Sequence, residues 1–247
     1  MHELIHVPAF TARFNGFIAM AREAEKKQHE NVGPMRMEFT NAKEGDAAEI
    51  SIYGIIGDPF DGSDANTLGR FLRDNRKRAV NVRINSPGGL AFDGITIHNA
   101  LLQHDGKVTT TIEGSAGSAA SIIAVAGSPA RIYENANFFI HRASLSAGGN
   151  ADVFREALDW LDQLDEAIAR TYKAKTGKSM EKVMEQMIGN GGDGTPFSAR
   201  DAVANKYVDE IVPLKRADAK ASNMLSAATI RQAKREDSRR AFLNQCK

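Results

Sequence analysis

The chain has 247 residues, of which 42% are hydrophobic and 26% are charged, and its formal net charge is +1. This length and composition accommodate one or two domains with a proper hydrophobic core and exclude a disordered chain. The single cysteine, Cys246, cannot form an internal disulfide, and the opening MHELIHVPAF starts no long apolar stretch. We therefore expect a cytoplasmic protein without a signal peptide or a membrane span.

Charge is distributed unevenly along the chain. Residues 215–247 contain nine basic and three acidic side chains, a net of +6 in a chain whose total is +1. The sparse apolar residues of this basic tail predict a helix that is marginal alone, or a disordered segment. The sequence thus predicts an N-terminal extension (1–45), a main domain (46–214) and a basic tail (215–247). No aromatic residues alternate with the basic ones, so we do not expect a nucleic-acid partner.

Hydrophobic periodicity predicts strands that alternate with helices along the main domain. The expected strands are Glu49–Ile56, Val80–Ile84 and Thr109–Glu113, and the expected helices are Asp64–Asp74, Phe92–Leu102, a buried helix from a turn at Gly114 through Ala126, and Ala151–Thr176. Strand, helix and strand in succession normally form a right-handed parallel unit. We therefore predict an α/β fold with a mostly parallel sheet and crossover helices.

Three motifs among these expected strands and helices contain candidate catalytic residues: INSPGG, GSAGSAASIIAVAG and FFIH. Gly88 and Gly89 have no side chains, so their backbone amides can approach a substrate carbonyl closely. Ser118 stands at an expected helix start, where unpaired N–H groups such as that of Ala119 can stabilise an oxyanion. A serine hydroxyl needs a base within hydrogen-bond reach to attack at neutral pH, and His141 can supply it.

The order and spacing of these motifs resemble the ClpP family of self-compartmentalising serine peptidases, over roughly residues 49–212. That family has an NSPGG turn, a G-x-A-A-S segment about 30 residues on, and M-I-H about 25 residues later. Gly114–Ser118 match the second motif, with Gly117 in place of an alanine, and Ile140–His141 match the third. His141 is two residues closer to the serine than in the family, which we attribute to a shorter hairpin around Ser128–Asn137.

The resemblance implies the ClpP/crotonase fold and assigns roles to individual residues. Its ungapped register makes Ser118 the nucleophile, rather than Ser115 or Ser121, and His141 the base. The implied oxyanion hole consists of two backbone amides, those of Gly89 and Ala119. No cofactor is expected. No metal is expected either, because the remaining histidines lack the spacing of metal ligands.

The third member of a serine–histidine–aspartate triad is harder to place in the sequence. The family's aspartate precedes an F-L-S-A-x-E-A segment that resembles PFSARDA here, and Asp193 stands five residues before Ser198, where the family spacing is nearer four. We predict Asp193, with Asn190 or a water as the alternatives. Asp201 lies three residues after Ser198 in an S-x-x-D capping box, so we assign it a structural role.

The long helix predicted at Ala151–Thr176 resembles the handle that interdigitates between stacked rings in ClpP relatives. One stripe of this helix is apolar and would leave an exposed patch on a monomer; it consists of Leu161, Leu164, Ile168 and Tyr172. We therefore expect a homo-oligomer of stacked rings. An ordinary surface helix is the alternative.

The predicted function is that of a ClpP-like serine endopeptidase, whose hydrolytic chemistry itself needs no ATP. The N-terminal extension and the basic tail do not resemble a housekeeping ClpP subunit. The AEISIYGIIG start and the SAGSAAS segment resemble the head-maturation proteases of tailed phages, so capsid or scaffold proteins are the expected substrates. A housekeeping Clp subunit that works with an AAA+ unfoldase is one alternative. A crotonase-type acyl-CoA enzyme and a catalytically dead ring are the others.

Overall fold

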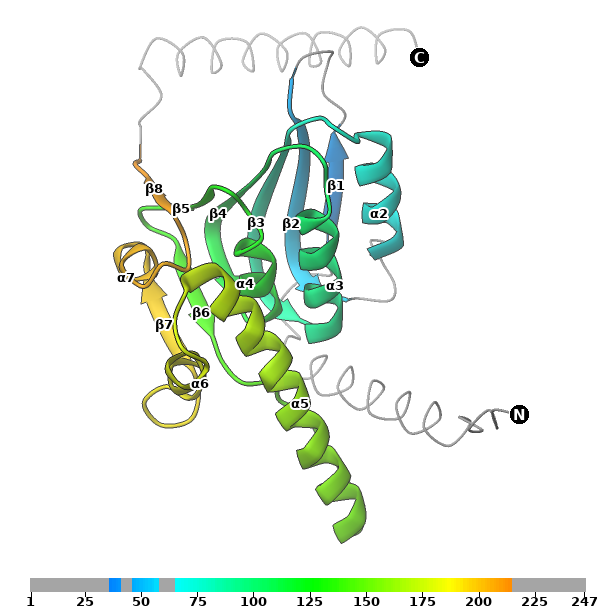
Figure 1. Ribbon diagram of the computed structural model, residues 1–247, viewed down its shortest axis with the longest axis vertical. Helices are drawn as coiled ribbons and strands as arrows, with labels where there is room; N and C mark the ends of the chain where they lie inside the picture. The colour runs from blue at the N-terminus through cyan, green and yellow to red at the C-terminus, as the bar shows by residue number, and fades with distance from the viewer. Residues whose placement is uncertain (1–35, 41–45, 58–64, 215–247) are drawn as a thin grey trace, which may run out of the picture. The chain divides into compact units, whose positions relative to one another are not determined.

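The computed structural model describes residues 36–40, 46–57 and 65–214. Within these ranges one eight-stranded sheet has the order β1-β2-β3-β4-β5-β8, and β6 pairs with β4 and with β7 (Figure 1). The strands are β1 (Arg36–Thr40), β2 (Ala48–Ile56), β3 (Val80–Gly89), β4 (Val108–Gly117), β5 (Ala130–Tyr133), β6 (Asn137–Ile140), β7 (Thr195–Ser198) and β8 (Glu210–Val212). The helices are α2 (Ala65–Asp74), α3 (Ala91–Leu102), α4 (Ala119–Ala124), α5 (Ala151–Thr176), α6 (Met180–Ile188) and α7 (Ala199–Ala204).

The sheet is mostly parallel, which confirms the predicted α/β class. Among the described strands, β1 with β2 and β6 with β7 are the antiparallel pairs. Strand β1 falls in the segment assigned to the N-terminal extension (1–45), while residues 1–35 and the basic tail lie outside the described ranges. The three predicted parts therefore stay predictions. None of the helices in the described ranges is long and apolar enough to cross a membrane.

The structure corrects where the catalytic motifs change direction. We predicted a turn at Gly114, but β4 continues to Gly117, and β3 likewise runs through the SPGG motif to Gly89. Both extensions are paired in the sheet, since Gly88 lies opposite Ile55 of β2 and Ser86 opposite Ala116 of β4. Pairing with a neighbouring strand thus overrides the turn preference of the glycines and the proline, at the cost of a local irregularity in each register.

The segment that leads to His141 also differs from the prediction. We predicted a hairpin around Ser128–Asn137, but β5 and β6 are not partners of each other. Both run parallel to β4, with β5 beside Thr110–Ile112 and β6 beside Ser115–Gly117. This arrangement brings the end of β6 next to the end of β4, so the histidine and the serine are neighbours in the sheet.

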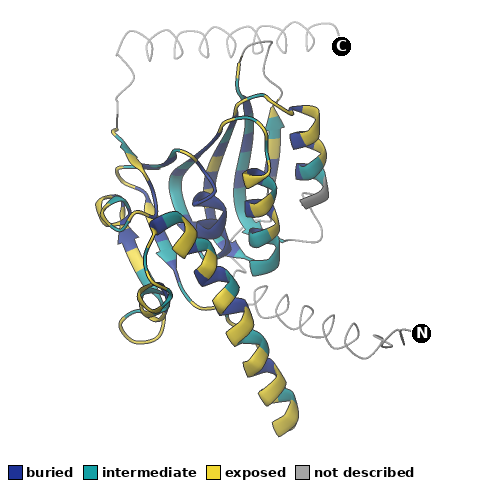
Figure 2. Cartoon of the chain, viewed as in Figure 1, coloured by how far each residue is buried: buried dark blue, intermediate teal, exposed yellow. Residues whose placement is uncertain are grey.

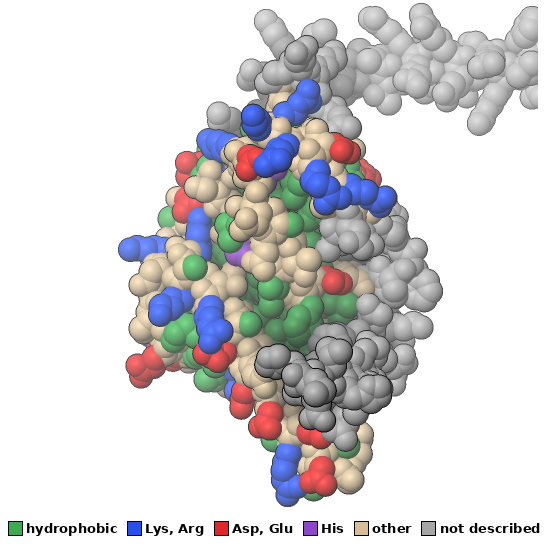
Figure 3. Space-filling model, turned by 45° about the vertical axis from the view of Figure 1, so that its right-hand side comes forward, with side chains coloured by type: hydrophobic (Ala, Val, Ile, Leu, Met, Phe, Trp, Pro, Cys, Tyr) green, Lys and Arg blue, Asp and Glu red, His purple; other side chains and the backbone are tan. Residues whose placement is uncertain are grey.

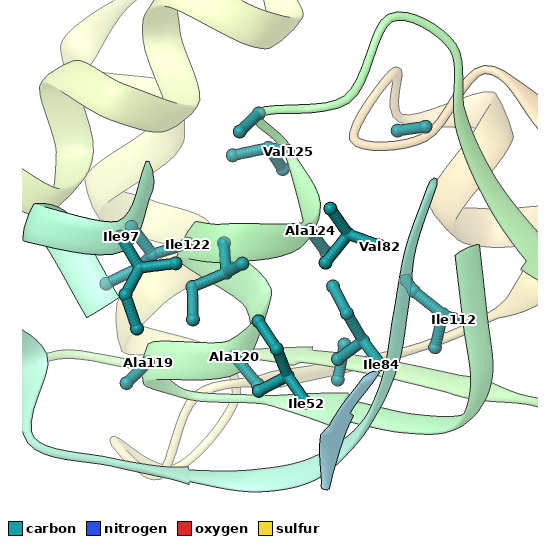
Figure 4. Packing of buried hydrophobic residues seen from close by; sticks show 14 of the residues in the cluster. Ile52, Val82, Ile84, Ile97, Ile112, Ala119, Ala120, Ile122, Ala124 and Val125 are labelled. Atoms are coloured by element: carbon teal, nitrogen blue, oxygen red, sulfur yellow. The ribbon is translucent and has the colours of Figure 1, made fainter. Parts of the chain in front are cut away.

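Helix α4 is buried along its whole length between the sheet and α3. Figure 4 shows side chains of the strands, Ile52 and Ile84 among them, converging on Ala120 and Ala124 of α4. Alanines on this helix allow a close approach to its neighbours. On the α3 side, a Cβ placed on Gly94 would lie 2.9 Å from the carbonyl oxygen of Ala119. The start of α4 is therefore fixed from both sides by close packing.

Helix α5 has the predicted bounds, but its apolar stripe, which we expected to be exposed on a monomer, is mostly buried in the core. Its 26 residues span about 39 Å, and its N-terminal half protrudes from the sheet layer (Figures 1 and 2). Leu164, Ile168 and Tyr172 are 7%, 3% and 1% exposed, because the C-terminal half packs in the core. The exposed large apolar residues of α5 are instead Phe154 and Leu158, which are 46% and 62% exposed.

Candidate active site

Ser118 occupies a sharp turn between β4 and α4. Its backbone has φ 51° and ψ −125°, a left-handed conformation that side-chain-bearing residues rarely adopt. Such a conformation costs about 1–3 kcal/mol and persists only where its surroundings hold it. Here the Ser118 N–H donates to Phe139 O at 3.0 Å, and Ser118 O accepts from the Ser121 N–H at 2.9 Å. The turn therefore holds the serine hydroxyl at the end of the sheet.

His141 follows β6 and meets this hydroxyl directly. The distance from His141 Nε2 to Ser118 Oγ is 2.7 Å, and the imidazole stacks on the Phe139 ring with centroids 5.2 Å apart. Burial lowers the pKa of His141, so the imidazole stays neutral at neutral pH. A neutral imidazole can accept the serine proton, which is the requirement for a general base.

Buried side chains satisfy the carbonyl oxygens of α4. A helix this short leaves most of its carbonyls without partners inside the helix. His98 Nδ1 donates to Ile122 O at 2.9 Å, and Thr110 Oγ1 donates to Ala124 O at 2.6 Å. Burial lowers the pKa of His98, in line with a neutral structural histidine. These bonds keep α4 rigid behind the nucleophile.

Glycines of the SPGG motif lie against the nucleophile. A Cβ on Gly88, whose φ is +117°, would come within 2.5 Å of Ser118 Cβ, so no other residue fits there without a shift. The Gly88 N–H donates to Ser86 Oγ at 3.1 Å and is therefore already engaged. Gly89 and Ala119, rather than Gly88, line the cavity beside the serine. This placement agrees with the predicted pair of oxyanion amides, whose role stays a prediction.

The cavity beside Ser118 and His141 has a mostly apolar wall. Its lining includes Leu90, Phe92, Ile122, Trp160 and Leu164. The rings of Phe92 from α3 and Trp160 from α5 are in contact, with centroids 5.2 Å apart. Figure 3 shows one face of the molecule, on which hydrophobic side chains gather in the middle while most charged side chains lie toward the edges.

Asp193 is not brought into contact with the imidazole. It is exposed in the turn between α6 and β7, and its carboxylate makes no hydrogen bond to His141 among the described residues. The next residue, Gly194, lies against the histidine, since a Cβ placed on it would be 2.5 Å from His141 Cβ. Gly194 stands four residues before Ser198, at the spacing that the family resemblance favours. In this chain a glycine thus occupies that position, and Asp193 stays a prediction.

The sequence did not predict the place of three further residues at the site, Asp165, Ser121 and Tyr172. Asp165 on α5 is 3% exposed, and its carboxylate accepts from the Ala143 N–H at 2.6 Å, which fastens the segment after His141 onto α5. Burial raises the pKa of Asp165, although the bond from Ala143 and the nearby Arg142 guanidinium oppose that shift. In the sequence, Asp165 directly follows Leu164 of the apolar stripe, and this position was the signal that could have indicated a buried carboxylate. Ser121 and Tyr172 also lie behind the nucleophile, joined by a contact of 2.7 Å.

The sequence profile of the Clp protease family matches residues 48–215, which include the turn, the nucleophile segment and the histidine. The chain belongs to the Clp protease family. Proteins named ATP-dependent Clp protease proteolytic subunit are among those similar to the chain. The protein from Mesostigma viride is 29% identical over 139 residues, which cover 54% of this chain and 61% of the relative. The protein from Nuphar advena is 28% identical over 202 residues, which cover 76% of this chain and 98% of the relative.

A third Clp protease relative, from Chlorokybus atmophyticus, bears the same name and is 28% identical over 139 residues. The chain thus spans about three fifths of the length of the Mesostigma and Chlorokybus proteins, at 61% and 62%. The family match confirms the resemblance and the fold class predicted from the motifs. These matches do not distinguish the head-maturation subtype from other Clp proteases.

Proposed function

We propose that this chain is a serine endopeptidase with Ser118 as nucleophile and His141 as general base. The observation that carries the proposal is the 2.7 Å contact between Ser118 Oγ and His141 Nε2 beside an apolar cavity. For this contact to activate the serine, the hydroxyl must donate to an unprotonated Nε2, so the imidazole proton must sit on Nδ1. The lowered pKa of His141 supports that neutral form.

The proposed reaction has two steps. As Ser118 Oγ attacks the carbonyl carbon, its proton moves to His141, and the oxyanion accepts hydrogen bonds from the amides of Gly89 and Ala119. When the C–N bond breaks, His141 returns the proton to the leaving amine and an acyl-serine remains. Water then attacks the ester with His141 again as the base, which releases the carboxylic acid and restores the serine.

Reaction with a fluorophosphonate probe tests this proposal and separates it from the crotonase alternative. An acyl-CoA enzyme uses amides as an oxyanion hole but has no need of an activated serine, so it should not react. We expect the intact mass to rise by one probe adduct per chain, with peptide mapping locating the adduct at Ser118. A chain that stays unmodified while folded would overturn the proposal and favour the dead ring or the acyl-CoA enzyme.

The pH dependence of peptide hydrolysis should follow the titration of His141. Protonation removes the base, and burial lowers the pKa of His141 below its ordinary value of about 6.5. The acidic limb of kcat/KM should therefore have its midpoint below pH 6.5, with a plateau at neutral pH. Initial rates measured from pH 5 to 8 check this expectation. A midpoint above 6.5 would contradict it, because burial would then not govern the titration of His141.

We also propose that the active particle is a ring whose contacts include the protruding half of α5. Phe154 and Leu158 are four residues apart, so they share one face of the helix, and both are exposed. Covering the exposed parts of the two residues, 46% and 62%, against a second copy would contribute roughly 1.5–3 kcal/mol per chain before the cost of association. This pair replaces the predicted stripe, in which the core already buries Leu164, Ile168 and Tyr172 while Leu161 is half-buried.

The double variant Phe154→Asp, Leu158→Asp should dissociate the particle into smaller species, because it places two charges in the proposed contact. Sedimentation velocity beside a peptide assay measures the effect, and we expect lower activity in the smaller species. Gln163→Asp on an exposed position of α5 is the matched control and should sediment like the wild type. A double variant that also sediments like the wild type would refute the contact.

For the natural substrates we propose capsid or scaffold proteins of a phage, because the AEISIYGIIG start and the nucleophile segment resemble the head-maturation proteases. The name shared by the relatives, ATP-dependent Clp protease proteolytic subunit, favours a second candidate, in which an unfoldase ATPase delivers folded proteins. Degradation assays distinguish the two. Efficient cleavage of a purified capsid or scaffold protein without ATP supports the first, and degradation of a stably folded protein only with ATP and an unfoldase supports the second.

A further inference from the structure

A directed chain of hydrogen bonds joins α5 to the nucleophile turn. Ser121 Oγ donates to Ser118 O at 2.5 Å, and Tyr172 OH lies 2.7 Å from Ser121 Oγ. A carbonyl oxygen can only accept, so the Ser121 hydroxyl proton is committed to Ser118 O and Tyr172 must be the donor to Ser121. Ser121 and Tyr172 are 0% and 1% exposed, so water does not compete for these bonds. The chain therefore runs in one direction, from α5 to the turn.

The chain ends on the peptide group that links Ser118 to Ala119. In a planar trans peptide the C=O and the N–H point in opposite directions. Ser118 O accepts two hydrogen bonds from Ser121, one from the N–H at 2.9 Å and one from Oγ at 2.5 Å. These bonds fix the oxygen edge of the plane, and so they also fix the direction of the Ala119 N–H on its other edge. Ala119 is one of the residues that line the cavity beside the nucleophile.

The turn needs such an anchor because its backbone conformation is unfavourable by itself. Ser118 has φ 51° and ψ −125°, and it is one of the few residues with a side chain that have positive φ in the described ranges. The Ser118 N–H is held by Phe139 O at 3.0 Å, on the other side of the residue. With the Ser121 hydroxyl removed, Ser118 O would keep one of its two bonds and the peptide plane could rotate.

We propose that Ser121 and Tyr172 are positioning residues, which hold the Ser118–Ala119 peptide so that the Ala119 N–H faces the oxyanion. This inference rests on the proposed peptidase function. Because Tyr172 belongs to α5, the orientation of that N–H depends on how the C-terminal half of α5 is seated in the core. Burial raises the pKa of Tyr172, so the phenol remains a donor over the whole range in which His141 titrates.

Two variants and a matched control test the inference. Ser121→Ala removes the hydroxyl that binds Ser118 O, and Tyr172→Phe removes only the phenolic oxygen. Thr176→Val removes another buried hydroxyl of α5, which binds Tyr172 O at 2.8 Å and is not part of the chain to the turn. Removal of one oxyanion donor lowers kcat by about 10²–10³-fold. Misalignment should cost less, so we expect kcat to fall on the order of 10–100-fold in the two variants with KM nearly unchanged.

Inhibition by a peptide boronic acid separates positioning from general destabilisation. The tetrahedral boronate places an oxygen in the oxyanion hole, so its inhibition constant should rise by about the same factor as kcat falls. The double variant should be no slower than Ser121→Ala, because both changes break one chain. Thr176→Val should keep kcat and the inhibition constant even if its melting temperature falls.

The outcomes distinguish this inference from the proposed function. If the wild type reacts with the fluorophosphonate and both variants keep the wild-type kcat and boronate inhibition, the positioning role is wrong. It is also wrong if Thr176→Val loses as much activity as Tyr172→Phe, since the effect would then follow from core damage. A wild type that does not react with the fluorophosphonate would instead contradict the proposed function itself.

Discussion

Replacing Ser118 with alanine should abolish peptide hydrolysis and fluorophosphonate labelling while leaving the fold intact. The hydroxyl is the only group lost, and loss of the nucleophile in a serine protease lowers kcat by about 10⁶-fold. The side chain makes its described contact with His141 Nε2 at 2.7 Å, and the strained backbone of the turn is held by main-chain bonds that alanine also makes. Intact mass after labelling and a peptide assay measure the two losses, and circular dichroism checks the fold.

Ser115→Ala provides the matched control for the nucleophile. Ser115 lies three residues earlier in β4, in the paired part of the strand opposite Asn137. Its N–H donates to Asn85 Oδ1 at 3.2 Å, a bond that alanine keeps. We expect this variant to retain labelling and hydrolysis. Continued labelling of Ser118→Ala at another serine would show that the assigned nucleophile is wrong.

Replacing Asp193 with asparagine should lower kcat by about 10⁴-fold if its carboxylate orients the imidazole, as in the serine–histidine–aspartate template. The amide keeps the size of the side chain but carries no charge and has an NH₂ donor, so the imidazole would lose the anionic, acceptor-only partner that favours a proton on Nδ1. The measurement is kcat with a saturating peptide, beside the rate of fluorophosphonate labelling. In the described structure it is Gly194, the next residue, that lies against His141.

Asp201→Asn is the control for the loss of a nearby carboxylate. The Asp201 N–H donates to Ser198 Oγ at 3.3 Å, and the Ser198 hydroxyl donates to the Asp201 carboxylate at 2.6 Å, so the predicted capping role is the observed one. This variant should keep its turnover and lose roughly 1 kcal/mol of stability. Near-normal turnover in Asp193→Asn as well would mean that Ser118 and His141 act without that carboxylate.

The sequence alone was sufficient for some of the regular elements, α5 among them, and for the pairing of serine with histidine. Helix α5 has its predicted bounds because a 26-residue amphipathic stretch starts at an N-cap, Asn150, and ends at a left-handed glycine, Gly177. Ser118 and His141 could be paired in advance because each stands in a short motif whose neighbours match one family. The helix signals are local and the pairing of Ser118 with His141 depends on the order of the motifs, so both can be recognised in the sequence alone.

Only the tertiary structure decided which apolar faces are core and where the strands end. The periodicity of Leu164, Ile168 and Tyr172 is the same for a helix that packs on its own sheet as for one that packs on a second copy, so exposure could not be predicted from it. The strands β3 and β4 pass through glycine and proline because neighbouring strands pair with them, and pairing partners are distant in sequence.

The bonds behind the nucleophile depend on the fold in the same way. Ser121 and Tyr172 are 51 residues apart, and the direction of their hydrogen bonds follows from burial and from the carbonyl oxygen they serve. Gly194 lies against His141, and the acidic residue Asp193 is one position earlier in the chain. Residue types and spacing thus predicted the candidate catalytic residues. The packing of α5 against α4 and the pairing of β7 with β6 determined which side chains lie at the site, because such contacts are set by three-dimensional distance and not by position along the chain.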